Sequence, residues 1–103
     1  IKADAFHDAF AGDLPPATAS VMAASQRPID ASILGEASGP PAWKTIRSWY
    51  MVARDDHTIP AATERFMAQR AGANTVEVRS SHVAMISHPD AVTRLILSAA
   101  QGS

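Results

Sequence analysis

Two short stretches in the second half of the chain have different hydrophobic patterns. From Trp49 to Ala53 both alternating sets of positions are apolar, which is typical of an inner parallel strand covered on both faces. In residues 74–79 only every second position is apolar, with Val76 and Val78 on one side and polar residues on the other. This second pattern predicts a half-exposed, outer strand.

A helix is predicted between the two strands. Pro60 opens it, because proline is tolerated in the first turn, and it runs to about Arg70. Phe66 and Met67 are expected to face inward, and Gly72 is expected to end the helix.

Another helix is predicted after the second strand. Ser87 can cap it, with Asp90 at the third helical position. Its inward face is expected to carry four apolar residues, Val92, Leu95, Ile96 and Ala99.

The first third of the chain is helical and interrupted by prolines. Phe6 and Phe10 are four residues apart, so a short helix from about Asp4 would present both rings on one face. A second helix can be capped by Asp13, with two prolines in its first turn, and its face would carry Val21, Met22 and Ser25. Residues 35–41 are rich in glycine and proline and are predicted to form a loop.

The order strand, helix, strand predicts an α/β fold in which the two strands are parallel neighbours joined by a right-handed crossover. The carboxyl ends of parallel strands meet at one edge of the sheet. The residues that follow the first strand, Asp55 and Asp56, are therefore expected near His82, which follows the second. An aspartate there can hold an imidazole in one tautomer while its other nitrogen takes a proton from a nucleophile.

The composition and the net charge of the chain exclude several classes of function. A chain of 103 residues with 47% apolar composition has room for one compact domain. The formal charge of −1 offers no field that would attract nucleic acid or an anionic membrane, and the lack of cysteine excludes thiolate chemistry and disulfides. No apolar run approaches the roughly 20 residues of a membrane span, so we expect a soluble, cytoplasmic protein.

Four segments carry a resemblance to a known family: Pro41–Pro60, Glu64–Ala73, Val76–His82 and, upstream, Gln26–Ile29. Together they resemble the C-terminal portion of α/β-hydrolase-fold enzymes. The branch they are most similar to is the small bacterial esterase-like one, which is related to plant methylesterases and hydroxynitrile lyases. The resemblance implies a lid segment with a linker over residues 1–40 and a strand–helix–strand–helix unit of the hydrolase core over residues 41–103.

The resemblance also implies site residues. The family places its triad acid four residues before the proline that opens the helix, which selects Asp56, with Asp55 as the alternative. The base is implied to be His82, and His88 receives no catalytic role. Neither a cofactor nor a metal is expected, and the substrate is expected to be a small-molecule ester. The acyl pocket would be lined by residues of the lid segment, Phe6, Phe10, Leu14 and Met22.

The chain departs from the family at the nucleophile. It contains no Gly-x-Ser-x-Gly motif, and the most similar segment, Gly35–Gly39, has the wrong spacing and follows no predicted strand. One hypothesis is that the chain supplies the acid and base of a serine hydrolase and is inactive alone. The alternative is a non-catalytic α/β module that self-associates, because a two-stranded sheet is marginal by itself. Pairing through the uncovered edge of the inner strand would supply a neighbour and produce a homo-oligomer.

Overall fold

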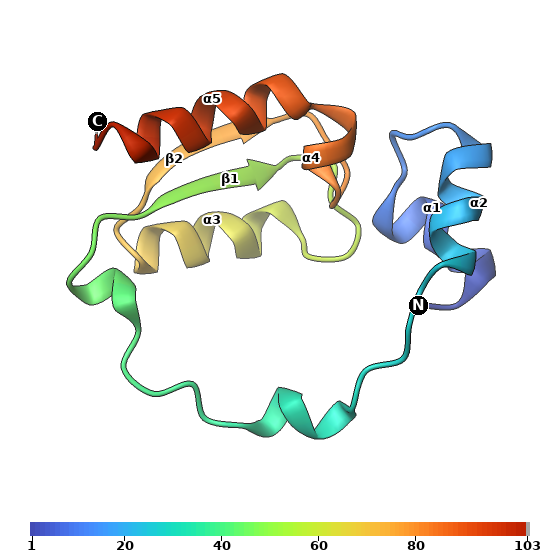
Figure 1. Cartoon of the computed structure of the whole chain (residues 1–103), viewed down its shortest axis with the longest axis horizontal. Helices are drawn as coiled ribbons and strands as arrows, with labels where there is room; N and C mark the ends of the chain where they lie inside the picture. The colour runs from blue at the N-terminus through green and yellow to red at the C-terminus, as the bar shows by residue number, and fades with distance from the viewer. Residues whose placement is uncertain (103) are drawn as a thin grey trace.

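A computed structural model describes residues 1–102, in which β-strands form a short parallel sheet with helices on both of its faces (Figure 1). In chain order, the elements are α1 (Ala3–Phe10), α2 (Pro16–Ala24), η1 (Ala31–Gly35), η2 (Ala42–Lys44), β1 (Trp49–Ala53), α3 (Ala61–Arg70), β2 (Asn74–Val78), α4 (Ala84–Ser87) and α5 (Pro89–Ala100). No helix within residues 1–102 is long and apolar enough to cross a membrane.

The two strands form the predicted parallel pair. Their register runs from Trp49 opposite Asn74 to Ala53 opposite Val78. The helix α3 lies against one face of this sheet and α5 against the other, as Figure 1 shows. Val52 and Ala53 are buried between these layers and β2 is largely exposed, as predicted. The inner position predicted for β1 is not formed within residues 1–102, because the sheet there has two strands and the first three residues of β1 are only half-buried.

The helices α1 and α2 pack against each other at one end of the molecule. Phe6 is 3% exposed and belongs to a small apolar core that also includes Val83, from the segment after β2. The Phe6 and Phe10 ring centroids are 5.0 Å apart, as the spacing of four predicts. The Val83 contact joins the helical segment to the end of the sheet that carries His82.

The predicted cap of α2 is wrong. The helix begins at Pro16 with Pro15 in the capping position, and no side chain accepts a bond from its first turn. The fixed φ angle of the two prolines is sufficient to start the helix without a side-chain cap. Asp13 therefore interacts with other residues instead. Val21, which we placed on the packed face of this helix, is also exposed.

Three other predictions from the second half are also wrong. Phe66 on α3 and Ile96 on α5 are 62% and 61% exposed, because nothing within residues 1–102 covers the helix faces on which they lie. Ser87 does not cap α5: it is the last residue of α4, and α5 begins at Pro89 with His88 in the capping position.

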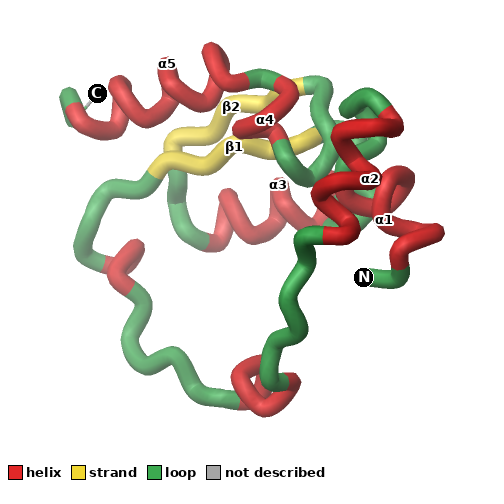
Figure 2. Tube along the Cα trace, turned by 45° about the vertical axis from the view of Figure 1, so that its right-hand side comes forward, coloured by secondary structure: helices red, strands yellow, loops and turns green. Residues whose placement is uncertain are grey.

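Residues 25–48 form an open arc between α2 and β1, visible in both Figure 1 and Figure 2. Its regular parts are the two short 3-10 helices, the first of which is capped by Asp30, whose carboxylate accepts the Ser32 N–H at 2.9 Å. The glycine- and proline-rich stretch from Gly35 to Pro41 has no helix or strand after Gly35, as predicted for a loop.

Candidate active site

The parallel ladder continues past the ends of both strands. The Arg54 N–H donates to the Val78 carbonyl at 2.9 Å, and the Asp55 N–H donates to the Ser80 carbonyl at 3.0 Å. These bonds hold the segment after β1 alongside the segment after β2. They thereby bring the next functional side chain on each segment, Asp56 and His82, to the same edge of the sheet.

Asp56 and His82 are joined by a hydrogen bond. The His82 Nδ1 and Asp56 Oδ2 atoms are 2.8 Å apart, a distance typical of a charge-assisted bond. The Asp56 side chain is 0% exposed and the His82 side chain is 29% exposed. With its proton on Nδ1, the imidazole has Nε2 free to accept a proton, and no residue within 1–102 hydrogen-bonds that nitrogen.

The other oxygen of Asp56 is fixed by the backbone. Oδ1 accepts the Thr58 N–H at 2.7 Å and the Ile59 N–H at 3.0 Å, which makes a tight turn directly before α3. Burial alone would raise the pKa of Asp56, but hydrogen bonds from Glu64, Ile59, His82 and Thr58 outweigh it and lower the pKa. Asp56 is therefore an ionised carboxylate that serves as both a turn-former and a partner of the imidazole.

Glu64 is a residue of this site that the sequence analysis missed. It lies on α3, is 6% exposed, and accepts the Ala53 N–H through Oε1 at 2.8 Å. Its carboxyl group is also in hydrogen-bond contact with Asp56. The sequence offers only the spacing of four residues between Glu64 and Ala68. In the structure both are buried, on the face of α3 that packs on β1.

The helical segment at the N-terminal end reaches this site directly. The Phe10 ring centroid is 4.8 Å from that of His82, with the planes inclined at 41°. The Thr58 hydroxyl donates to the Ala9 carbonyl at 2.6 Å, so α1 is tied to the turn that holds Asp56. One face of the imidazole is therefore covered by a side chain of α1.

A second histidine–aspartate pair lies nearby and differs in geometry. His88 Nδ1 and Asp13 Oδ2 are 3.7 Å apart, which is longer than a hydrogen bond, and the Asp13 side chain is 27% exposed. Burial would raise the pKa of Asp13, and hydrogen bonds from Ser81 and Ser87 lower it. Nδ1 of His88 is instead 3.0 Å from the Ser87 hydroxyl. This pair lacks the buried, oriented carboxylate that Asp56 provides.

A comparison with known protein families identifies the family of this chain. A sequence model described as the alpha/beta hydrolase family matches residues 2–95. The chain belongs to the alpha/beta hydrolase family. No curated protein and no solved structure gave a significant match. The family and the α/β fold class predicted from the sequence are therefore confirmed, whereas the esterase-like branch stays a prediction.

Within this alpha/beta hydrolase, the residues implied for the acyl pocket have different surroundings. Phe6 and Leu14 are buried in the apolar core between α1 and α2, and Met22 packs against that core. Phe10 is the member of this set whose ring contacts His82. The prediction of a substrate-binding role therefore depends on Phe10.

The segment Gly35–Gly39 is confirmed as part of a loop. Ser38 is exposed, and within the described residues neither a strand before it nor a helix after it forms a nucleophile elbow. The sharp strand-to-helix turn that this hydrolase family uses to present its serine is therefore not formed by these residues.

Asp56, Glu64 and His82 also lie close enough together to hold a metal ion. Ligand atoms of Asp56, Glu64 and His82 all lie within 4.8 Å of one another. The atoms that would face a cation are already used: His82 bonds Asp56, and Glu64 bonds Asp56 and the Ala53 N–H. The hydrogen bonds account for the cluster without a metal, and the absence of a metal requirement stays a prediction.

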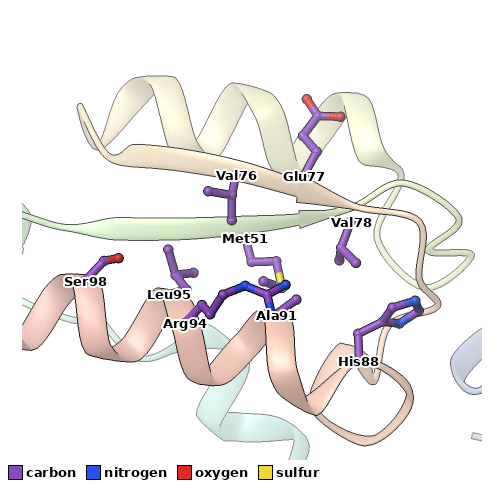
Figure 3. A pocket seen from close by; sticks show the side chains of 9 residues that line it. All are labelled: Met51, Val76, Glu77, Val78, His88, Ala91, Arg94, Leu95 and Ser98. Carbon is purple, nitrogen blue, oxygen red and sulfur yellow. The ribbon is translucent and has the colours of Figure 1, made fainter.

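A cavity of about 410 Å³ lies between the sheet and α5 (Figure 3). Met51 and Val78 extend toward it from the sheet, and Leu95 and Ala91 extend toward it from the helix. Neither Asp56 nor His82 lines it. Its mostly apolar walls belong to the interface between two layers of the fold, apart from the candidate catalytic pair.

Proposed function

We propose that this chain supplies the acid and the base of a serine hydrolase of the esterase-like branch, which cleaves small-molecule carboxylic esters. The observation that carries the proposal is the 2.8 Å bond between His82 Nδ1 and the buried, backbone-held carboxylate of Asp56. The catalytic serine comes from a segment outside these 103 residues, because His82 bonds Asp56 and no serine within residues 1–102.

The proposed reaction follows the usual two halves of acyl transfer. His82 Nε2 takes the proton of the serine hydroxyl as the serine oxygen attacks the ester carbonyl carbon, and Asp56 stabilises the imidazolium that results. His82 then gives this proton to the departing alkoxide, which leaves as an alcohol. In the second half, His82 takes a proton from water, the hydroxide attacks the acyl-serine, and the proton returns to the serine as the carboxylic acid is released.

In this proposal residues 1–40 act as a lid over the site. Support comes from the ring of Phe10 on His82, the Thr58 to Ala9 bond and the Val83 contact with the core of the helical segment. An exposed ion pair between His57 and Asp8, with its atoms 3.5 Å apart, adds a further contact between α1 and the acid loop. Residues of the lid would thus contact the acyl group of the substrate.

The proposal is tested by comparing this chain with a longer polypeptide. The 103-residue chain alone is expected to hydrolyse p-nitrophenyl butyrate at the background rate. A polypeptide extended at its N-terminus by the natural coding sequence is expected to hydrolyse it and to react with a fluorophosphonate probe at a serine outside these residues. The measurement is initial rate together with mass spectrometry of the labelled peptide.

Two outcomes would contradict this proposal. Hydrolysis by the short chain, with the probe on one of its own serines, would show that the nucleophile lies within these residues. A folded longer polypeptide that neither hydrolyses esters nor takes the probe would exclude the hydrolase. Concentration-dependent self-association of such a protein would then support the alternative, a non-catalytic module that pairs through the free edge of β1.

A substitution of Phe10 tests the substrate-binding role. Phe10→Ala in the longer polypeptide is expected to raise KM for p-nitrophenyl butyrate by about 5–30-fold and to leave kcat nearly unchanged, because burying an apolar acyl chain against a ring contributes about 1–2 kcal/mol. The control is Phe66→Ala, since Phe66 is 62% exposed on α3 and is expected to leave both constants unchanged. An unchanged KM for Phe10→Ala would remove this residue from the substrate site.

A further inference from the structure

The buried carboxyl group of Glu64 is not used by the reaction proposed above. Its Oε1 atom accepts the Ala53 N–H at 2.8 Å, which anchors the side chain to the last residue of β1. Oxygen atoms of the Glu64 and Asp56 carboxyl groups also lie within 4.8 Å of each other. A side chain held at one oxygen by the backbone and aimed at the proposed triad acid is well placed to orient that acid.

Two buried carboxyl groups in hydrogen-bond contact cannot both be ionised cheaply, so the pair is expected to hold one proton. Asp56 has three further donors, the Thr58 and Ile59 N–H groups and the His82 imidazole, and these stabilise its negative charge. Glu64 has a single backbone donor. The proton therefore resides on Glu64, and the Glu64 O–H donates to the Asp56 carboxylate.

We propose that Glu64 is a positioning residue, a neutral carboxylic acid that donates a hydrogen bond to Asp56 and so fixes the carboxylate that orients His82. The inference rests on the proposed function, in which Asp56 and His82 act as acid and base. It gives Asp56 a fourth hydrogen bond, which comes from α3 itself and not from the turn that precedes it. It also explains why a glutamate lies on the face of α3 that packs on the sheet.

The ionisable groups around Glu64 agree with this assignment. Burial and the contact with Asp56 raise the pKa of Glu64 to about 7. Tyr50 on β1 has its pKa raised by burial and then by the charges of Glu64 and Asp56. Arg65, the next residue on α3, is engaged by Glu77 at 2.7 Å and does not neutralise Glu64. Asp56 and His82 are the other ionisable groups that face it.

The assignment has a pH-dependent consequence. Because the pKa of Glu64 is raised above its ordinary value, the donated bond is fully present at low pH and is lost as the pH rises through about 7. Above that pH a second negative charge lies beside Asp56 and the donor is gone. Glutamine has nearly the same shape, can accept the Ala53 N–H with its oxygen and donate to Asp56 with its amide, and does not ionise.

The test uses the longer polypeptide with Glu64→Gln, Glu64→Leu and, as the matched control, Glu36→Gln. Glu64→Gln is expected to retain kcat within about threefold at about pH 6, and the ratio of wild-type to variant kcat/KM is expected to fall as the pH rises to about 9. Glu64→Leu is expected to lose about 10-fold or more in kcat relative to Glu64→Gln at every pH, with KM unchanged, because leucine offers no donor. Glu36→Gln, which changes an exposed carboxylate outside the site, is expected to follow the wild type throughout.

A second measurement separates this inference from the proposed function. The side-chain carboxyl NMR signal of Glu64, assigned with the Glu64→Gln variant, is expected to titrate near pH 7 whether or not the protein hydrolyses esters. A midpoint near the ordinary glutamate value of about 4.3 would overturn the inference even if the hydrolase is active. A ratio of wild-type to Glu64→Gln activity that does not change with pH would also overturn it. An inactive protein whose Glu64 titrates near 7 would overturn the hydrolase and leave the shared proton established.

Discussion

Replacing His82 by alanine is expected to lower kcat of the longer polypeptide by about 10⁴-fold or more, because the residual rate of a triad enzyme without its base comes from binding and the oxyanion hole alone. Within residues 1–102, the imidazole is the one group that both bonds the buried Asp56 carboxylate and keeps a nitrogen free for the serine proton. KM is expected to change little, since the ring transfers a proton and does not hold the acyl chain. The measurement is the rate of p-nitrophenyl butyrate hydrolysis, with circular dichroism to check folding.

Two other histidines provide matched controls for this variant. His57→Ala removes an exposed side chain whose Nδ1 lies 3.5 Å from Asp8, and it is expected to retain nearly full activity. His88→Ala tests the second histidine–aspartate pair, in which the atoms are 3.7 Å apart. A large loss in His88→Ala combined with an active His82→Ala would move the base to His88 and contradict the proposed site.

Replacing Asp56 by asparagine is expected to lower kcat by about 10³–10⁴-fold. The asparagine oxygen would take the place of Oδ1 and accept the Thr58 and Ile59 N–H groups, so its amide nitrogen would face His82. An N–H donor in that place favours the tautomer of His82 with its proton on Nε2, and that nitrogen then cannot accept the serine proton. The loss is therefore expected in kcat and in a folded protein, because the turn before α3 is preserved.

Asp55→Asn is the matched control for the acid. Asp55 is exposed, and its backbone N–H donates to the Ser80 carbonyl. Its substitution is expected to change kcat by less than about threefold, as for a surface position away from the reacting groups. A larger loss in Asp55→Asn than in Asp56→Asn would assign the acid to Asp55, the alternative that the sequence left open.

Much of the core unit could be predicted from the sequence because its signals are local. Two apolar strand patterns of different type, a proline that opens a helix and a glycine that ends it suffice to give the parallel pair of β1 and β2. The order of these elements then places Asp56 near His82, because parallel strands end on the same side. The family resemblance covers the same segment, and the family match over residues 2–95 agrees with it.

The errors concern contacts that depend on distant parts of the chain. Phe66 and Ile96 have the spacing of inward residues, yet whether a helix face is covered depends on what packs there, and nothing within residues 1–102 covers these two. Asp13 has the residue type of a helix cap, but its carboxylate lies 3.7 Å from Nδ1 of His88, a residue from the far end of the chain. Residue type gives a capacity for an interaction, and the neighbours in space decide which interaction forms.

The sequence by itself determined the order of the elements, the α/β class and the pairing of an aspartate with a histidine at the end of a parallel sheet. Only the tertiary structure decided which groups surround that pair, namely Phe10 on the imidazole and Glu64 on the carboxylate. The physical reason is that these contacts join residues far apart along the chain, in α1 and α3, whose meeting depends on how whole layers pack. In the sequence, Glu64 has the pattern of an ordinary polar residue on a helix. Only its burial against β1 makes it the partner of Asp56.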